Sequence, residues 1–226
     1  MLDSPAVSVT LAVVAWLVLS AFFPAAIGQV THFLVRTPAT LTHEFSHAFT
    51  AAATGGLPTG LRVTSATSAS VRSVHFTAVS RALTPAAGYV MTPLIGLLMV
   101  LVTQLGDSSA LRAAPIAFLI AVSLVCLLLS RNLLALCASL WLLAVSSFLF
   151  LTPLVNPVWV GLGLVLVATA DAARLLRRHL LEGRGFDSDA TALPFRLLHP
   201  ALISGVWMSV SCAALGCSVL VIVRTL

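Results

Sequence analysis

Residues 43–47 read His43-Glu44-Phe45-Ser46-His47, an H-E-x-x-H run within an otherwise apolar chain. Residues four apart share one face of a helix, so the two imidazoles can bind a single metal ion. Glu44 projects beside that ion and can take a proton from a metal-bound water. The spacing is typical of zinc hydrolases, and it predicts one zinc ion per chain with Glu44 as the general base. The alternative is a pair of structural histidines beside a buried, protonated glutamic acid.

The composition is that of an integral membrane protein. Of the 226 residues, 59% are hydrophobic and only 8% are charged, whereas soluble domains carry about 25% charged residues. The formal net charge of +5 comes from twelve arginines with no lysine, and these lie beside apolar segments rather than on one basic face. We therefore expect contact with a lipid bilayer and no nucleic-acid partner.

Apolar runs long enough to span a bilayer, which takes about 20 helical residues, occur six times. They lie near 6–27, 86–105, 113–130, 133–152, 155–173 and 201–223. A seventh stretch, at 29–53, carries the motif and is more polar, so neighbouring helices must shield it if it spans. The sequence thus predicts an all-α polytopic membrane protein of about seven transmembrane helices, with residues 1–226 forming a single domain.

The arginines predict how the chain is oriented. With seven spans and a cytoplasmic N-terminus, nine of the twelve arginines fall in connections on the cytoplasmic side. This distribution agrees with the positive-inside rule. Arg36, Arg112 and Arg224 are then left towards the other side. We expect an integral protein of a plasma membrane with its N-terminus in the cytoplasm.

A β-hairpin is predicted after the motif helix. Thr54-Gly55-Gly56 is a helix stop, and the stretches 60–65 and 70–77 are β-branched and partly alternating. We place the hairpin insert at about 57–83. An edge strand beside a metal could hold an unwound peptide by strand addition. The alternative is a hairpin that only covers the site.

A third metal ligand must come from elsewhere in the chain, because a catalytic zinc ion normally has three protein ligands and an open position. Asp189 is our first choice, since its turn precedes the last span on the same side of the membrane as the motif. Asp171 is the second choice. The alternative roles are a helix N-cap for Asp189 and an interfacial ion pair with Arg174 for Asp171.

Other polar residues are weaker candidates. His75 is a possible near-site residue, whereas we expect His179 and His199 to make ordinary hydrogen bonds at the membrane interface. Asn132 lies at a break between two spans. It either hydrogen-bonds an oxyanion or a substrate strand, or caps the helix that follows.

Five segments together match the pattern of one known family. They are Leu41-Thr42-His43-Glu44-Phe45-Ser46-His47-Ala48, Thr54-Gly55 with the strand region after it, Ala87-Gly88-Tyr89 with Pro93, Arg131-Asn132-Leu133 and Asp187-Ser188-Asp189-Ala190. In these segments the chain resembles the site-2 protease family of intramembrane zinc metallopeptidases, especially its short bacterial members without a PDZ domain. The resemblance covers most of the chain and implies a bacterial membrane protein.

The resemblance also implies zinc on His43, His47 and an aspartate, Glu44 as general base, and cleavage of a membrane-embedded protein substrate. One element differs from the family pattern. The better-known members carry the third ligand in an N-x-x-P-x-x-x-x-D-G-like element, but here Asp189 is followed by Ala190.

The sequence therefore predicts an intramembrane zinc metalloprotease that hydrolyses peptide bonds of membrane-embedded proteins. Two other functions stay open. A catalytically inactive relative that binds a membrane partner or acts as a scaffold is favoured by the missing Asp-Gly element. A small transporter is disfavoured, because the ionisable residues form a single cluster rather than a chain across the membrane.

Overall fold

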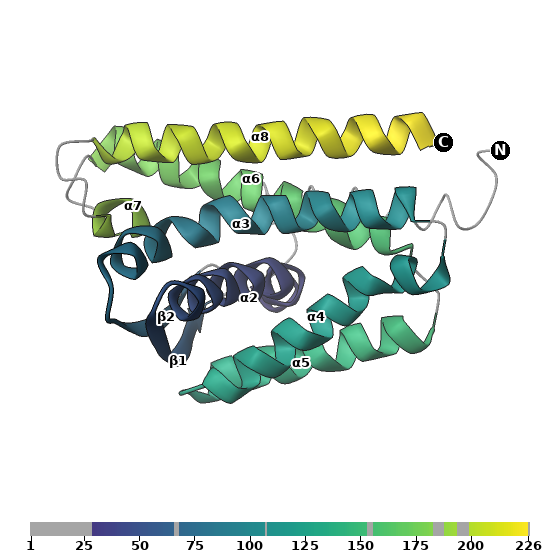
Figure 1. The fold of residues 1–226 in the computed structure, drawn as a ribbon, viewed down its shortest axis with the longest axis horizontal. Coiled ribbons are helices and arrows are strands. Elements are labelled where there is room, and N and C mark those ends of the chain that lie inside the picture. Colours follow the sequence, from purple (N-terminus) through teal and green to yellow (C-terminus); the bar gives the residue numbers. More distant parts are fainter. Residues whose placement is uncertain are drawn as a thin grey trace.

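The computed structural model describes residues 29–65, 68–106, 108–152, 156–182, 188–193 and 199–225. Over these ranges the chain is mostly helical, with one antiparallel hairpin (Figure 1). The helices are α2 (Gln29–Ala53), α3 (Ala78–Leu105), α4 (Ser109–Leu129), α5 (Leu133–Leu151), α6 (Pro157–Glu182), α7 (Asp189–Ala192) and α8 (Pro200–Thr225), and the strands are β1 (Gly56–Ser65) and β2 (Ser68–His75).

Five of the described helices, α3, α4, α5, α6 and α8, are long and apolar enough to cross a membrane. They correspond to five of the six predicted apolar runs, and the remaining run, at 6–27, lies outside the described residues. The motif stretch forms α2 with the expected bounds of 29–53 but is not among the five. The total of seven spans and the cytoplasmic N-terminus therefore stay predictions.

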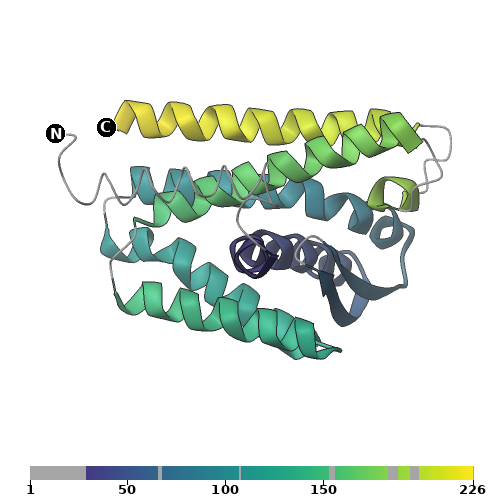
Figure 2. The same cartoon turned by 180° about the vertical axis from the view of Figure 1, so that it is seen from behind.

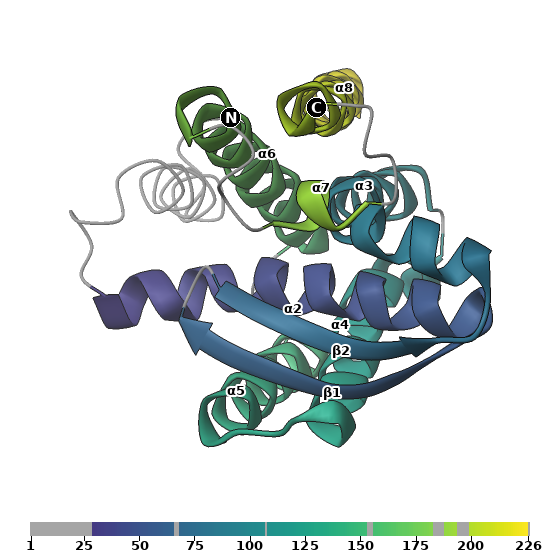
Figure 3. The same ribbon diagram turned by 90° about the vertical axis from the view of Figure 1, so that its left-hand side faces the viewer.

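The motif helix α2 runs across the direction of the long helices. Figure 1 draws α2 almost end-on, between α3 above and the pair α4 and α5 below, and Figure 3, turned by 90°, draws it lengthwise. Seen from behind in Figure 2, α6 runs diagonally across α3 towards α8. Helices α3, α4, α5 and α6 all contact α2, so the polar motif is surrounded by protein, as ionisable residues in a membrane protein require.

Two glycines let α3 and α6 approach closely beside the motif helix. A Cβ atom at Gly96 would lie 2.7 Å from the carbonyl oxygen of Gly161, and one at Gly161 would lie 2.7 Å from that of Gly96. Small residues at a crossing point are the usual way for membrane helices to pack tightly. This crossing fixes the two helices that form much of the wall around the motif.

Two helices are longer than predicted. Helix α3 begins at Ala78 rather than at residue 86, because the Thr77 side chain accepts a hydrogen bond from the Ser80 amide and caps an earlier turn. Helix α6 ends at Glu182 rather than at 173, since the Leu- and Arg-rich stretch after Asp171 consists of strong helix formers. Both extensions reach the region of the motif.

The predicted hairpin is confirmed, with somewhat different bounds. Strands β1 and β2 pair antiparallel, from Gly56 opposite His75 to Ser65 opposite Ser68. The turn between α2 and β1 uses Gly55 at a φ of +84°, a conformation that glycine adopts without a steric penalty.

The outer edge of β1 is occupied by the turn between α4 and α5. The Arg131 amide donates to the carbonyl of Leu61 at 2.9 Å. The side chain of Asn132 accepts from the Val63 amide at 3.2 Å and donates to the Val63 carbonyl at 2.7 Å. On the other side of the hairpin, strand β2 lies alongside α2 (Figure 3). The edge of β2 is therefore the one directed towards the motif.

Candidate metal centre

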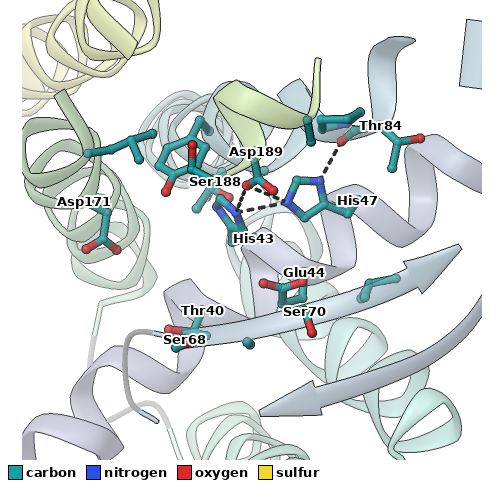
Figure 4. Close-up of a pocket in the computed structure, with 18 of the residues that line it drawn as sticks. Thr40, His43, Glu44, His47, Ser68, Ser70, Thr84, Asp171, Ser188 and Asp189 are labelled. Carbon is teal, nitrogen blue, oxygen red and sulfur yellow. Dashed lines mark hydrogen bonds and ion pairs between the residues drawn. The ribbon is translucent and has the colours of Figure 1, made fainter. Parts of the chain in front are cut away.

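The two histidines of the motif meet an aspartate from a distant part of the chain. The Nε2 atoms of His43 and His47 lie 3.0 Å apart. Asp189, at the start of α7, places its Oδ2 atom 3.3 Å from each of these nitrogens (Figure 4). The structure thus brings together the three residues predicted as ligands.

The three distances fit a zinc ion. Tetrahedral zinc has bonds of about 2.0 to 2.1 Å, which separate two ligand atoms by about 3.3 Å. The donors are also of the right kind, because two imidazole nitrogens and a carboxylate oxygen are common zinc ligands. Three protein ligands leave a fourth position open, as in catalytic rather than structural zinc sites.

The backbone of α3 orients His47. Its Nδ1 atom lies 2.6 Å from the carbonyl oxygen of Thr84. A carbonyl oxygen can only accept, so Nδ1 carries the proton and Nε2 keeps its lone pair towards His43 and Asp189. Such a hydrogen bond on the far ring nitrogen is what holds metal-binding histidines in place.

Helix α3 also makes room for His43. A Cβ atom at Gly88 would lie 2.3 Å from the His43 Nε2 atom. The neighbouring Tyr89 meets the His43 ring edge-on at a centroid distance of 4.6 Å and stacks on Trp207 of α8 at 4.8 Å. The orientation of His43 therefore depends on close packing against α3, which Trp207 supports from α8.

Asp189 is held as a carboxylate. Burial raises the pKa of Asp189, but His43 and His47, when they are protonated in the metal-free protein, lower it by more through hydrogen bonds and charge, so the pKa lies below the usual range. A deprotonated carboxylate is the form that binds a metal ion. The alternative role as a helix N-cap is wrong, because Ser188 is the N-cap of α7 and Asp189 is its first helical residue.

Glu44 lies on the opposite side of the histidines from Asp189, towards β2 (Figure 4). It is 4% exposed, and its carboxylate accepts a hydrogen bond from the Val71 amide of β2. The Oε2 atom has no hydrogen-bond partner among the described residues. Glu44, His43 and His47 offer ligand atoms that all lie within 4.8 Å of one another. A buried polar atom normally has a partner, so this oxygen is available to a water or substrate group beside the histidines.

A pocket of about 660 Å³ opens beside these residues and falls within the size range of ligand-binding cavities. Helices α2, α3, α6 and α7 and strand β2 form its wall. Strand β2 contributes a polar face, with Ser68, Ser70 and Ser73 among the residues that line the pocket. His43, His47, Asp189 and Glu44 all line this pocket, so a bound molecule could reach them.

Asp171, the second choice for third ligand, is paired with arginines instead. Its Oδ1 atom accepts hydrogen bonds from Arg174, at 2.9 Å, and from Arg36. The expected pair with Arg174 is confirmed. The side of the membrane towards which Arg36 lies stays a prediction, but its side chain is 0% exposed inside the protein. The reason is the crossing direction of α2, which keeps this position among its neighbours.

Three further polar residues have defined roles. Asn132 caps α5 by accepting from the Ala135 amide at 3.2 Å, which is the second of the two roles predicted for it. Its side chain also binds Val63 of β1. His75 lines the pocket and pairs with the Ser80 hydroxyl at 2.8 Å. His179 is 1% exposed and pairs with the Ser188 hydroxyl at 2.9 Å, while its position at the membrane interface stays a prediction.

A protein-family model described as Peptidase M50B-like matches residues 6–221, which is almost the whole chain. The matched range includes the H-E-x-x-H run, the hairpin and Asp189. No curated protein and no solved structure matches the chain.

Proposed function

The chain belongs to the Peptidase M50B-like family of site-2 protease-like metallopeptidases, and on that premise we propose that it hydrolyses peptide bonds of membrane-embedded proteins with one zinc ion per chain. One observation carries the proposal. Ligand atoms of His43, His47 and Asp189 form a triangle with sides of 3.0 to 3.3 Å, and Glu44 offers an unpaired buried oxygen on the other side of it.

We assign His43, His47 and Asp189 as the ligands of the zinc ion. Zinc held there would supply a Lewis acid and lower the pKa of a water towards about 7. Thr84 keeps the lone pair of His47 directed at the ion, and Gly88 leaves space for His43. These two contacts fix the ligands in advance, so little rearrangement is needed to bind the metal.

Glu44 is the general base in this proposal. It accepts a proton from the attacking water and then delivers that proton to the leaving amine. The Val71 amide holds one part of the carboxylate against β2, while Oε2 stays unpaired. The arrangement supports proton transfer, because the base is fixed and one of its oxygens is not engaged by the protein.

The β2 edge is the proposed binding place for the substrate. Amides within a transmembrane helix are bonded to each other, so a substrate must be locally unwound before it can be cleaved. Leu61 and Val63 at the β1 edge are already bonded to Arg131 and Asn132 of the α4–α5 turn. An unwound peptide can instead add to β2 as a further strand. Strand β2 runs along the pocket next to Glu44.

Two substitutions test this function. Glu44→Gln keeps the size of the side chain but removes the base, so we expect about one zinc per chain and a loss of cleavage of about 100-fold or more. His43→Ala removes a ligand, and we expect the zinc to be lost along with the activity. Metal analysis of the purified full-length chain and cleavage of a co-expressed membrane protein measure the two effects.

Two results would contradict the proposal. A wild-type chain that binds zinc but cleaves none of a broad panel of membrane proteins would favour the inactive relative. A folded wild-type chain that binds no zinc would remove the basis of the protease and leave the inactive relative or the transporter.

A further inference from the structure

The third ligand sits on an element that cannot hold itself in place. Helix α7 has four residues, Asp189–Ala192, and a single helical turn is far too short to be stable on its own. The other two ligands stand on α2, which has 25 residues. The position of Asp189 relative to His43 and His47 must therefore be set by contacts that α7 makes with the rest of the protein.

Apolar contacts hold α7 against the helices. Ala190 and Leu193 are buried in a cluster with Leu175 of α6 and Ile203 and Trp207 of α8. Burial of apolar surface is non-directional, so these contacts keep the segment docked without fixing how the turn is rotated. A rotation about the turn would carry the Asp189 carboxylate away from the histidines.

A directional contact comes from His179, near the end of α6. Its Nε2 atom lies 2.9 Å from the hydroxyl of Ser188, the residue directly before Asp189. The backbone of Ser188 is fixed as well, because the Thr191 hydroxyl accepts from its amide at 2.9 Å and donates to its carbonyl at 2.7 Å. Ser188 is thus held through both side chain and backbone, and Asp189 follows it in the chain.

We propose that His179 is a positioning residue for the metal centre, which acts through Ser188 to fix the Asp189 carboxylate opposite His43 and His47. The inference rests on the proposed function in one respect, since it takes Asp189 as the third ligand. His179 is buried at 1% exposure and does not line the pocket. It therefore influences the site through Ser188 and not through the substrate.

Loss of this contact should weaken metal binding. Without His179, α7 keeps its apolar contacts but can rotate, and Asp189 is no longer held at the histidines. Residues that orient metal ligands typically change metal affinity by about 10- to 100-fold when they are mutated. We expect a loss of that size in His179→Ala and in Ser188→Ala, the second of which removes only a hydroxyl.

The test measures zinc affinity of the purified full-length chain by competition with a chelator. His179→Gln should restore most of the affinity, because its amide nitrogen can replace Nε2. His199→Ala is the matched control, since His199 is exposed and only accepts from the Ala201 amide at the start of α8. His179→Ala should have no further effect in an Asp189→Ala background, whereas a general structural role would weaken binding there too.

The outcomes separate the two levels of inference. Wild-type zinc affinity in folded His179→Ala and Ser188→Ala overturns the role of His179 and leaves the proposed function intact. A further loss from His179→Ala in the Asp189→Ala background also overturns it. A folded wild-type chain that binds no zinc overturns the proposed function and this inference with it. If His179→Ala does not fold, Ser188→Ala decides, because it leaves the buried imidazole in place.

Discussion

At the scale of single residues, the metal centre depends on Gly88 as well as on its ligands. Gly88 lies in α3 directly against the His43 ring, where an added Cβ atom would come within 2.3 to 2.6 Å of three ring atoms. The ring could avoid that atom only by turning away. Turning would break its approach to His47 and Asp189, which lie 3.0 and 3.3 Å from its Nε2 atom.

Gly88→Ala should therefore weaken zinc binding without unfolding the protein. We expect a loss of at least about 10-fold in affinity, comparable to the loss of an orienting residue, because His43 leaves its place. Alanine is favoured over glycine in a helix by up to about 1 kcal/mol, so the substitution itself should not destabilise α3. Zinc titration and thermal unfolding measure both effects.

Gly205→Ala in α8 is the matched control for this substitution, because no atom lies within 4 Å of a Cβ atom at Gly205. It should bind zinc like the wild type. If folded Gly88→Ala also binds zinc with unchanged affinity, His43 does not act as a ligand in the orientation seen here.

The sequence identified the residues of the site that follow a spacing rule. His43, Glu44 and His47 came from their positions on one helix, and Asp189 came from a comparison of the few acidic residues. Thr84 and Gly88 could not be found in this way. Their roles arise where α3 crosses α2, and neither a threonine nor a glycine within an apolar helix carries a signal that it will face a histidine.

At the scale of elements, Asn132 connects two parts of the fold that the sequence treated separately. It caps α5 through the Ala135 amide and also pairs with both backbone groups of Val63 in β1. Arg131 adds bonds to the Thr59 carbonyl at 3.0 and 2.8 Å. The α4–α5 turn therefore holds the hairpin in position, and with it the β2 edge beside Glu44.

Asn132→Ala should loosen the hairpin while leaving the metal ligands in place. Loss of the cap and of the two bonds to Val63 should lower the free energy of unfolding by about 1 to 3 kcal/mol. Amide hydrogen exchange in β1 should become faster, and cleavage should fall. Zinc affinity should not change, because the ligands stand on α2 and α7.

The control for the Asn132 substitution is Asn156→Ala, which removes a comparable cap. The Asn156 side chain accepts from the Val158 amide at 3.1 Å, so this bond joins it to the start of α6 and not to the hairpin. It should reduce stability without changing exchange in β1. Unchanged exchange of the Val63 amide in Asn132→Ala would mean that other contacts hold the hairpin.

The hairpin itself was predictable. A helix stop is followed by two stretches in which β-branched residues partly alternate with other residues, and a turn separates the two stretches. The start of α3 was not, since the apolar run begins only at residue 86 and gives no sign of the turn that Thr77 caps ahead of it. The end of α6 is not predictable from hydropathy either. The apolar run ends at residue 173, although the arginines after it are good helix formers.

At the scale of the whole molecule, the crossing of α2 brings a buried charge to the centre of the protein. Hydropathy gives the length of a helix but not its direction, so the sequence could not show that Arg36 would meet Asp171 of α6. Arg36 is fully buried, and its Nε and Nη1 atoms have no hydrogen-bond partner among the described residues. Its ion pair with Asp171 therefore supplies the compensating charge that links α2 to α6.

The ion pair between Arg36 and Asp171 gives Asp171 a role different from that of Asp189, the other candidate for third ligand. Asp171→Asn removes the charge opposite a buried arginine. Breaking a fully buried pair typically costs about 3 to 5 kcal/mol, and we expect a smaller loss here because the Asp171 side chain is 34% exposed. Zinc binding should remain, because Asp171 bonds to arginines and not to the histidines. Asp189→Ala should have the opposite effect, with zinc bound much more weakly by the two remaining histidines and the stability of the metal-free chain little changed. Denaturation in detergent and metal analysis of the same preparations distinguish the two patterns.

Two controls complete the comparison of the aspartates. Arg174→Ala removes the more exposed partner of Asp171, with a side chain 38% exposed, and should cost only about 0 to 1 kcal/mol. Replacing both partners, as Arg36→Met with Asp171→Leu, should recover most of the stability lost in Asp171→Asn, because no unpaired charge is left inside. Zinc lost in folded Asp171→Asn but retained in Asp189→Ala would assign Asp171 as the third ligand. That result would require α6 to move towards the histidines when the metal binds.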